Sequence, residues 1–358
     1  MKIGILTYNR THNYGAVLQC YALQQTLVSM GYEVSVINYK QPFIEKTNSF
    51  FSSKYFLEKV RHPKAGLMWF YKLYIKNIKY WYIKCNNYKN FRKKFLKETK
   101  PCDNLNIPTY FDIYLIGSDQ LWTIYLTQGF DKTFFGDFEH GNGKIYSYAI
   151  SLNKKSINEI GYKRLKKYVP NFNVLSFRER KISEHLMKEY NIMSRCDIDP
   201  TLLANKEIWN KMINNNWKGE KYIALYQARY MPNDPTFLNK KANDLRKQMG
   251  DNYKIVDINS LNCSPEDFLS IIKYSRCVIT TSFHGVAFSI IFEKPLIVYR
   301  LNDGHDGRCI DLLEEIGAKE CILDSSEKPY INYIDYTKVK IKIDNFRKES
   351  LSYLYGLK

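Results

Sequence analysis

A single histidine, His284, stands between a buried strand and a helix in the stretch TTSFHGVAFSIIFEKPLIVY. Ser282 and Gly285 share its short polar break. The N–H groups and dipole at the start of the following helix favour an anion, and an imidazole placed there can meet an anion or transfer a proton. Gly285 would let a ligand approach the backbone closely. The alternative is a histidine that only caps the helix or fills the loop, which the spacing by itself favours.

Two arginines occupy comparable positions further along the chain. Arg178 ends the predicted strand in LSFRERK, where a buried cation is costly unless it meets an anion. Arg178 and Arg180 alternate along that strand, so we expect them on opposite faces. Arg308 precedes a predicted helix and could clamp a phosphate or carboxylate with its fork of donors. The alternatives are a salt bridge from Arg178 to Glu179 or another acid, and a surface position for Arg308.

Two polar turns in the first half of the chain could hold a sugar. In NRTHNYGAVLQ, the residues Asn13, Tyr14 and Gly15 open a helix whose free N–H groups suit an anion or a sugar hydroxyl. The stretch lacks the GxGxxG spacing, so dinucleotide binding is not supported, and a plain strand-to-helix turn is the favoured alternative.

The second turn is IGSDQLW, at the end of another buried strand. Asp119 and Gln120 offer polar groups for hydroxyls, and Trp122 offers an indole for the face of a sugar ring. A turn stabilised by the aspartate, with a tryptophan in the core, is an equally open interpretation.

The order of the elements that carry these residues predicts an α/β protein. Apolar runs such as KIGILTY are typical of strands buried on both faces, and helical spacing follows them. Such βαβ units imply parallel sheets, and 358 residues suggest two domains. We expect an acceptor-binding domain over 1–170, a donor-binding domain over 171–334, and a C-terminal helix over 335–358 that packs back on the first domain.

Residues 54–100 differ in character, with fourteen Lys/Arg, two acids and many interleaved aromatics. We expect a helical insertion, over about 50–100, in the first domain. Its basic and aromatic side chains could rest on an anionic membrane surface. A helical insertion with aromatics in the core and solvated lysines is equally consistent with the pattern.

Composition limits the remaining possibilities. The net charge of +18 points to an anionic partner, but no nucleic-acid-reading motif occurs, so nucleic acid is not expected. The eight cysteines show no zinc spacing, and no metal ligand set is evident. The first apolar run is too short for a signal peptide and no run approaches a membrane span. We therefore expect a reduced, cytoplasmic protein without metal or cofactor.

Taken together, the motifs resemble those of the polysaccharide pyruvyl transferase family. The resemblance runs from Met1 to about Ile322 and depends on the order and spacing of the motifs. Arg178 matches the arginine of the family's S-x-R-E motif, implicated in donor binding, and His284 matches the histidine of its [RS]-[LF]-H-G motif. Ser282 stands where characterised members often carry arginine, and Arg308 is the candidate for that charge. The ordered motifs are NYGAVLQCYAL, GSDQLW, SYAISL, SFRER, DPTLL, TTSFHGVAFSIIFEKPL and GRCIDLLEEIG.

The resemblance implies two Rossmann-like domains facing a cleft, as in GT-B proteins. It implies transfer of a pyruvyl group from phosphoenolpyruvate to two hydroxyls of a glycan or lipid-linked oligosaccharide, which forms a cyclic ketal and releases phosphate. In this interpretation the basic segment 54–100 could place a cytoplasmic enzyme on the inner face of the plasma membrane. A nucleotide-sugar glycosyltransferase is the first alternative, and a non-enzymatic binder of anionic surfaces ranks last.

Overall fold

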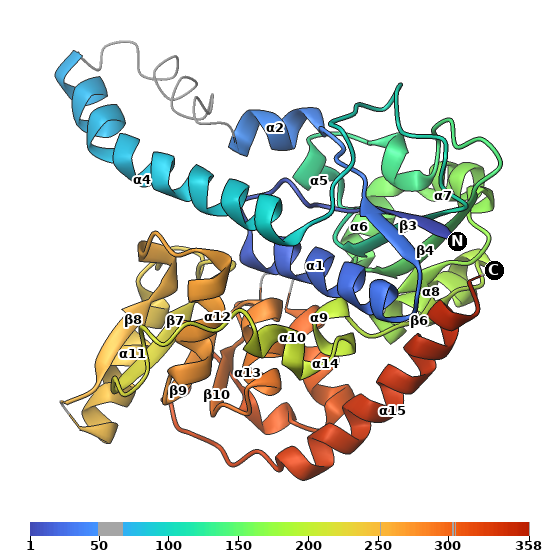
Figure 1. Cartoon of the computed structure of the whole chain (residues 1–358). Coiled ribbons are helices and arrows are strands. Elements are labelled where there is room, and N and C mark those ends of the chain that lie inside the picture. The colour runs from blue at the N-terminus through green and yellow to red at the C-terminus, as the bar shows by residue number, and fades with distance from the viewer. Residues whose placement is uncertain (49–66, 251, 303, 305, 358) are drawn as a thin grey trace. The chain divides into compact units, whose positions relative to one another are not determined.

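The computed structural model describes residues 1–48, 67–250, 252–302, 304 and 306–357 (Figure 1). The chain divides into two compact units, residues 1–175 and 176–358. The boundary expected after residue 170 falls within a short 3-10 helix, η2 (Val169–Asn171), five residues before the division between the units. The chain beyond it still bonds to unit 1, because Asn173 N donates to Ile145 O and Ser147 N donates to Val174 O.

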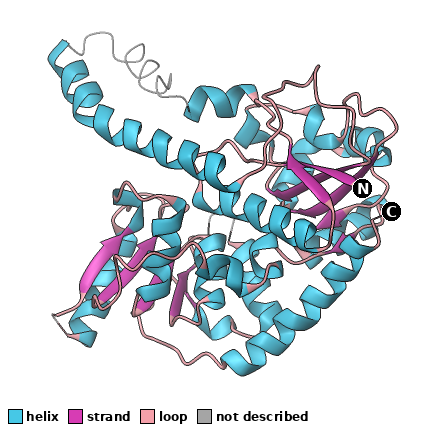
Figure 2. Cartoon of the chain, viewed as in Figure 1, coloured by secondary structure: helices cyan, strands magenta, loops and turns pink. Residues whose placement is uncertain are grey.

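Unit 1 is built on four parallel strands in the order β2-β1-β3-β4. Ile3 of β1 lies opposite Val34 of β2 and Ile113 of β3, and these apolar side chains are buried. Figure 2 shows the strands of each unit flanked by helices. The elements of unit 1 are β1 (Lys2–Leu6), α1 (Tyr14–Ser29), β2 (Glu33–Val36), α2 (Pro42–Asn48), α4 (Leu67–Phe95), β3 (Ile113–Asp119), α5 (Ile124–Thr127), η1 (Lys132–Phe135), β4 (Lys144–Ile150), α6 (Lys154–Ile160), α7 (Tyr162–Tyr168) and η2.

The basic aromatic insertion includes the longest helix of unit 1, α4, which extends away from the sheet of that unit (Figure 1). Its C-terminal part packs against the unit, since Tyr88 and Phe91 are buried. Part of the predicted insertion, residues 49–66, lies outside the described residues. Among the helices that the structure describes, none is long and apolar enough to cross a membrane.

Unit 2 contains a five-stranded parallel sheet in the order β11-β10-β9-β7-β8, and its short strands β5 and β6 pair in parallel with each other. Buried side chains of β7, β9 and β10 pack with α11 to form a core cluster. The elements of unit 2 are β5 (Ser176–Phe177), α8 (Arg180–Tyr190), β6 (Arg195–Cys196), α9 (Pro200–Leu203), α10 (Lys206–Asn210), β7 (Tyr222–Tyr226), α11 (Phe237–Met249), β8 (Lys254–Asp257), η3 (Ile258–Ser260), α12 (Pro265–Tyr274), β9 (Cys277–Thr280), α13 (Phe283–Ile291), β10 (Leu296–Tyr299), α14 (Gly307–Ile316), η4 (Lys319–Cys321), β11 (Ile322–Leu323) and α15 (Tyr336–Tyr355).

The C-terminal helix α15 belongs to unit 2 and packs there against α9 and α14. The Ser350 hydroxyl accepts a hydrogen bond from Ile198 N at 3.0 Å, and Arg347 donates to Leu202 O. These bonds connect α15 to the turn before α9 and to α9 itself. The packing of this helix on the first domain stays a prediction.

In each sheet the strand order reverses at one place, where the helices on either side leave in opposite directions. In unit 1 the reversal lies between β1 and β3, and in unit 2 between β7 and β9. Ligands of doubly wound sheets bind beyond the carboxyl ends of the strands at such a reversal. The turn with Asn13 follows β1, Asp119 ends β3, and His284 follows β9. The sequence-predicted residues therefore stand at the expected edge of each sheet.

Candidate active site

His284 lies in the first turn of the buried helix α13, directly after strand β9. The helix begins there because Ser282 is extended, with φ −104° and ψ 133°, and its hydroxyl accepts from Gly285 N at 3.4 Å. Ser282 is thus the capping residue. The His284 side chain is 9% exposed, so it is neither a cap nor a surface loop residue.

Three side chains from separate segments of unit 2 meet at this point: Arg178, Asp199 and His284. Arg178 follows β5, Asp199 precedes α9, and both side chains are buried. Arg178 Nη1 donates to Asp199 Oδ2 at 2.6 Å, and His284 Nε2 lies 3.9 Å from the same oxygen. One carboxylate oxygen therefore faces both the guanidinium and the imidazole. We refer to these three residues as the buried trio.

The orientation of the Asp199 carboxylate is determined by its role as the cap of α9. Its Oδ1 accepts from Thr201 N at 2.9 Å and from Thr201 Oγ1 at 2.6 Å. Pro200 occupies the first position of the helix, where its missing N–H has no cost. With Oδ1 held in this way, Oδ2 is directed toward Arg178 and His284.

The buried trio keeps Asp199 ionised. Burial by itself would raise the pKa of the Asp199 carboxyl. The charge of Arg178, followed by the imidazole of His284, opposes burial, and the hydrogen bonds from Thr201 act in the same direction. The net result is that the pKa of Asp199 lies below its usual value. The site thus presents an ionised carboxylate whose orientation is held at the start of α9.

Arg178 is held on two further sides. Its Nε donates to Glu179 Oε1 at 3.2 Å, and its guanidinium carbon lies 3.9 Å from the centre of the Phe283 ring. The salt bridge to Glu179, an alternative from the sequence, is therefore present. The expected alternation of Arg178 and Arg180 along one strand was wrong, because β5 ends at Phe177 and Arg180 begins helix α8.

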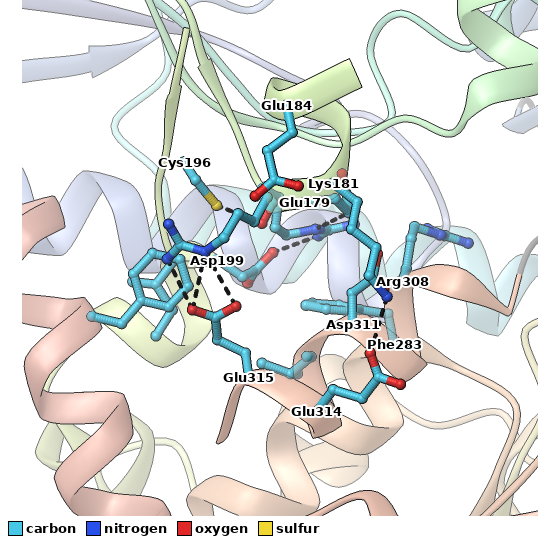
Figure 3. A pocket seen from close by; sticks show the side chains of 15 residues that line it. Glu179, Lys181, Glu184, Cys196, Asp199, Phe283, Arg308, Asp311, Glu314 and Glu315 are labelled. Carbon is cyan, nitrogen blue, oxygen red and sulfur yellow. Dashed lines mark hydrogen bonds and ion pairs between the residues drawn. The ribbon is translucent and has the colours of Figure 1, made fainter. Parts of the chain in front are cut away.

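A cavity of about 320 Å³ opens beside the buried trio, within unit 2 (Figure 3). This volume falls at the lower end of the range for small-molecule sites. Arg308, Arg178, Asp199 and Phe283 are among its lining residues, whereas His284 is not. The cavity thus combines two of the predicted donor-binding arginines with Asp199, whose Oδ2 lies 3.9 Å from His284 Nε2.

Ion pairs between helices α8 and α14 form part of the wall of this cavity. Arg180 pairs with Glu315 at 2.9 Å, and Lys181 pairs with Asp311 at 2.6 Å and with Glu314 at 3.0 Å. These acids therefore have cationic partners, which limits their repulsion of an anion in the cavity.

Gly285 is required by packing, and its role in donor binding stays a prediction. A Cβ at this position would lie 2.3 Å from Thr280 Oγ1 and 3.0 Å from Thr280 Cβ. The missing side chain allows α13 to pack closely on the end of β9. In this structure the group that lies close to the Gly285 backbone is the side chain of Thr280.

The first sugar-binding candidates, Asn13, Tyr14 and Gly15, form the N-terminus of α1 in unit 1. Asn13 caps the helix, because its Oδ1 accepts from Ala16 N at 3.2 Å. The Tyr14 ring is buried and stacks on Tyr88 of α4, with 5.6 Å between centroids. Gly15 is buried within the first helical turn. The turn is well formed, and its role in acceptor binding stays a prediction.

In the second candidate turn, Trp122 is a core residue. It is 1% exposed, its Nε1 donates to Phe134 O at 2.9 Å, and its ring stacks on Phe135 with 4.5 Å between centroids. The proposed sugar platform is therefore corrected in favour of the core tryptophan that the sequence left open. Asp119 adopts φ 81° and its Oδ1 accepts from Gln120 N at 2.9 Å.

Asp199 is the residue that the sequence interpretation did not assign. Its signal was present in DPTLL, where an aspartate before a proline is typical of a helix start. Only the fold shows that this cap also faces Arg178 and His284. Over the part of the chain that the structure describes, no group of three or more potential ligands could hold a metal ion.

These observations define an α/β protein with two Rossmann-like units and a buried arginine–aspartate–histidine trio in the second. The family model of the polysaccharide pyruvyl transferases matches residues 13–303, which is most of the chain. The chain belongs to this family, and its members are transferases. All three members of the buried trio lie inside the matched region.

Solved structures similar to this chain include two UDP-N-acetylglucosamine 2-epimerases and a glycosyltransferase. The putative epimerase from Listeria monocytogenes is 11% identical, with a TM-score of 0.47, and the match covers 100% of this chain and 91% of that one. The epimerase from Methanocaldococcus jannaschii is 11% identical, with a TM-score of 0.45 and coverage of 96% and 92%. Spinosyn rhamnosyltransferase is 9% identical, with a TM-score of 0.39 and coverage of 99% and 95%. No curated protein matches the chain.

Proposed function

We propose that this protein transfers a pyruvyl group from phosphoenolpyruvate to two hydroxyls of a sugar in a cell-surface polysaccharide or its lipid-linked precursor. Both hydroxyl oxygens bond to C2 of the donor, and the C2–O bond to phosphate breaks. One hydroxyl proton ends on the methylene carbon, which becomes a methyl group, and the other leaves with the phosphate. The products are a cyclic ketal and inorganic phosphate, so the reaction needs no redox partner.

The observation that carries this proposal is the buried trio, which lies inside the region matched by the family model. The reaction moves protons at two steps, and His284 is the titratable group at the end of β9 that can give or take one. Ionised Asp199, 3.9 Å away, stabilises the imidazolium form of the ring.

The donor would occupy the cavity beside the buried trio. Phosphoenolpyruvate carries a carboxylate and a phosphate, and the planar fork of an arginine suits either group. Arg308 and Arg178 both line the cavity. Because Ser282 caps α13 and carries no charge, Arg308 is our candidate for the second cation.

The acceptor would bind unit 1, and α4 would bring the protein to an anionic membrane. Helix α4 contains eight Lys/Arg and no acid, and both Ile78 and Tyr82 on it are exposed. Basic charge combined with exposed apolar and aromatic side chains suits an anionic lipid surface.

Flotation with phosphatidylglycerol vesicles should be lost in a Lys89→Glu/Lys93→Glu variant and kept in a Lys188→Glu/Lys247→Glu control. Equal binding by both variants would refute this role of α4.

Two measurements test the proposed reaction. Calorimetry should detect binding of phosphoenolpyruvate to the wild-type protein, and this binding should weaken on Arg308→Gln. Incubation with a panel of lipid-linked and free glycans should release phosphate only when an acceptor is present. Absence of both binding and release would refute the proposal, and thermal stabilisation by UDP- or GDP-sugars instead would favour the glycosyltransferase alternative.

A further inference from the structure

We propose that Asp199 is a positioning residue that holds His284 with a proton on Nε2, so that Nδ1 is the nitrogen that exchanges a proton during the reaction. This inference rests on the proposed function for its catalytic meaning. The placement of the proton itself follows from the geometry of the buried trio and can be measured without a substrate.

The first step concerns the charge that faces the imidazole. The Asp199 carboxylate accepts three hydrogen bonds, from Arg178 Nη1, Thr201 N and Thr201 Oγ1. All three donors favour the ionised carboxylate, so Oδ2 presents a negative charge to the ring. His284 Nε2 lies 3.9 Å from this oxygen.

The second step concerns the lone pairs. The anionic Oδ2 lies 3.9 Å from Nε2, so a deprotonated Nε2 would place the negative end of the ring dipole near a negative charge, which is unfavourable. A protonated Nε2 places positive charge near this oxygen instead and is attracted to it. Nε2 therefore carries hydrogen in both the neutral ring and the imidazolium, and the two forms differ only at Nδ1.

The third step concerns rigidity. Oδ1 is fixed by Thr201 at the start of α9, and Arg178 fixes Oδ2 from the side of β5. The Phe283 ring lies edge-on to the imidazole, with 5.3 Å between centroids and an angle of 87°. The carboxylate is thus held in one orientation, with its Oδ2 on the side of His284 Nε2.

The direct test is the tautomer of His284 in the wild-type protein. The chain contains six histidines, so ¹⁵N-histidine spectra that correlate ring nitrogens with ring protons are simple, and the His284→Gln variant identifies the signal. We expect Nε2–H and a bare Nδ1 at a pH where the ring is neutral. A bare Nε2 with a protonated Nδ1 would overturn the inference.

Two variants separate positioning from structural support. Asp199→Asn removes the charge at nearly constant shape, and we expect a mixed tautomer and a kcat at least about 100-fold lower, because loss of the orienting carboxylate misplaces the ring proton. Thr201→Val removes only the Oγ1 bond, so the Nε2–H signal should persist with a smaller loss of kcat. Equal tautomer populations in wild type and Asp199→Asn would also overturn the inference.

The outcomes distinguish this inference from the proposed function. If the wild-type spectrum shows Nε2–H but phosphoenolpyruvate neither binds nor reacts, the positioning stands and the proposed reaction fails. If pyruvyl transfer is observed but His284 has a bare Nε2, the reaction stands and the positioning fails. Should Asp199→Asn not fold, the wild-type spectrum alone decides.

Discussion

The guanidinium of Arg178 lies 3.9 Å from the centre of the Phe283 ring, and Phe283 is the residue directly before His284 in α13. This contact connects the arginine after β5 to the histidine after β9. A cation over an aromatic face is stabilised by about 1–2 kcal/mol when both are buried. The Phe283 ring therefore helps to hold Arg178, which is part of the proposed donor site.

Replacing this ring should weaken donor binding without removing a charge. In Phe283→Leu we expect the KM for phosphoenolpyruvate to rise roughly 5- to 30-fold, in proportion to the lost contact with Arg178. Phe346→Leu is the matched control, because Phe346 also lines the cavity but lies near Arg180 at 5.7 Å. Equal KM values in wild type and Phe283→Leu would show that the contact has no role in binding.

The pair of Arg178 and Asp199 should be costly to break. Arg178→Met leaves a buried carboxylate without its main counter-charge, and loss of one partner of a buried pair costs about 3–5 kcal/mol. Lys188→Met is the control, since Lys188 is 84% exposed and lies 4.0 Å from Glu189. Urea unfolding should show a large fall in the free energy of unfolding for the first variant only. A fall below 1 kcal/mol would contradict the importance of the pair.

Asp199 also illustrates what the sequence could and could not reveal. Apolar runs predicted the central strands, and ordered motifs predicted Arg178 and His284. The meeting of Arg178 with Asp199 depends on the parallel pairing of β5 and β6, two-residue strands with too little pattern to set a register. Trp122 shows a second limit of the sequence. The sequence does not say which face of a turn is buried, so it could not decide between a core tryptophan and a sugar platform.

Gly285→Ala should destabilise the protein through packing. The added methyl would lie 2.3 Å from Thr280 Oγ1, and overpacking of this kind costs about 1–3 kcal/mol. Gly307→Ala is the control, because an added Cβ there meets nothing within 4 Å. Thermal unfolding should show a lower Tm for Gly285→Ala alone. An unchanged Tm accompanied by weaker donor binding would contradict the packing role and support the approach of a ligand to Gly285.

His12, in the loop after β1, should make unit 1 sensitive to acid. Burial, and then the charges of Lys84 and Arg92, lower its pKa from 6.5 to about 4, against the opposing effect of Glu45. Between these values the unfolded chain binds more protons than the folded one, so the free energy of unfolding falls as the pH falls from 6.5 to 4. The destabilisation caused by the lowered pKa of His12 is absent above pH 6.5 and complete below about pH 4.

The measurement for His12 is urea unfolding across this pH range. His12→Gln should lose roughly 2 kcal/mol of the acid-dependent destabilisation, after allowance for partial solvent exposure. The matched control is His185→Gln, a substitution on helix α8 that leaves His12 in place. Identical slopes for wild type and His12→Gln would show that His12 titrates normally in the folded protein.

The central claim is that the buried trio serves pyruvyl transfer from phosphoenolpyruvate, and the most direct test follows the donor carbon. Phosphoenolpyruvate labelled with ¹³C at C2 is incubated with the protein and a glycan acceptor that has two neighbouring hydroxyls. The account predicts that the label appears as a ketal carbon on the glycan with wild type and His185→Gln, and not with a folded His284→Gln variant. Labelled ketal formed equally well by His284→Gln, or label that never leaves phosphoenolpyruvate with any acceptor that binds wild type, would contradict it.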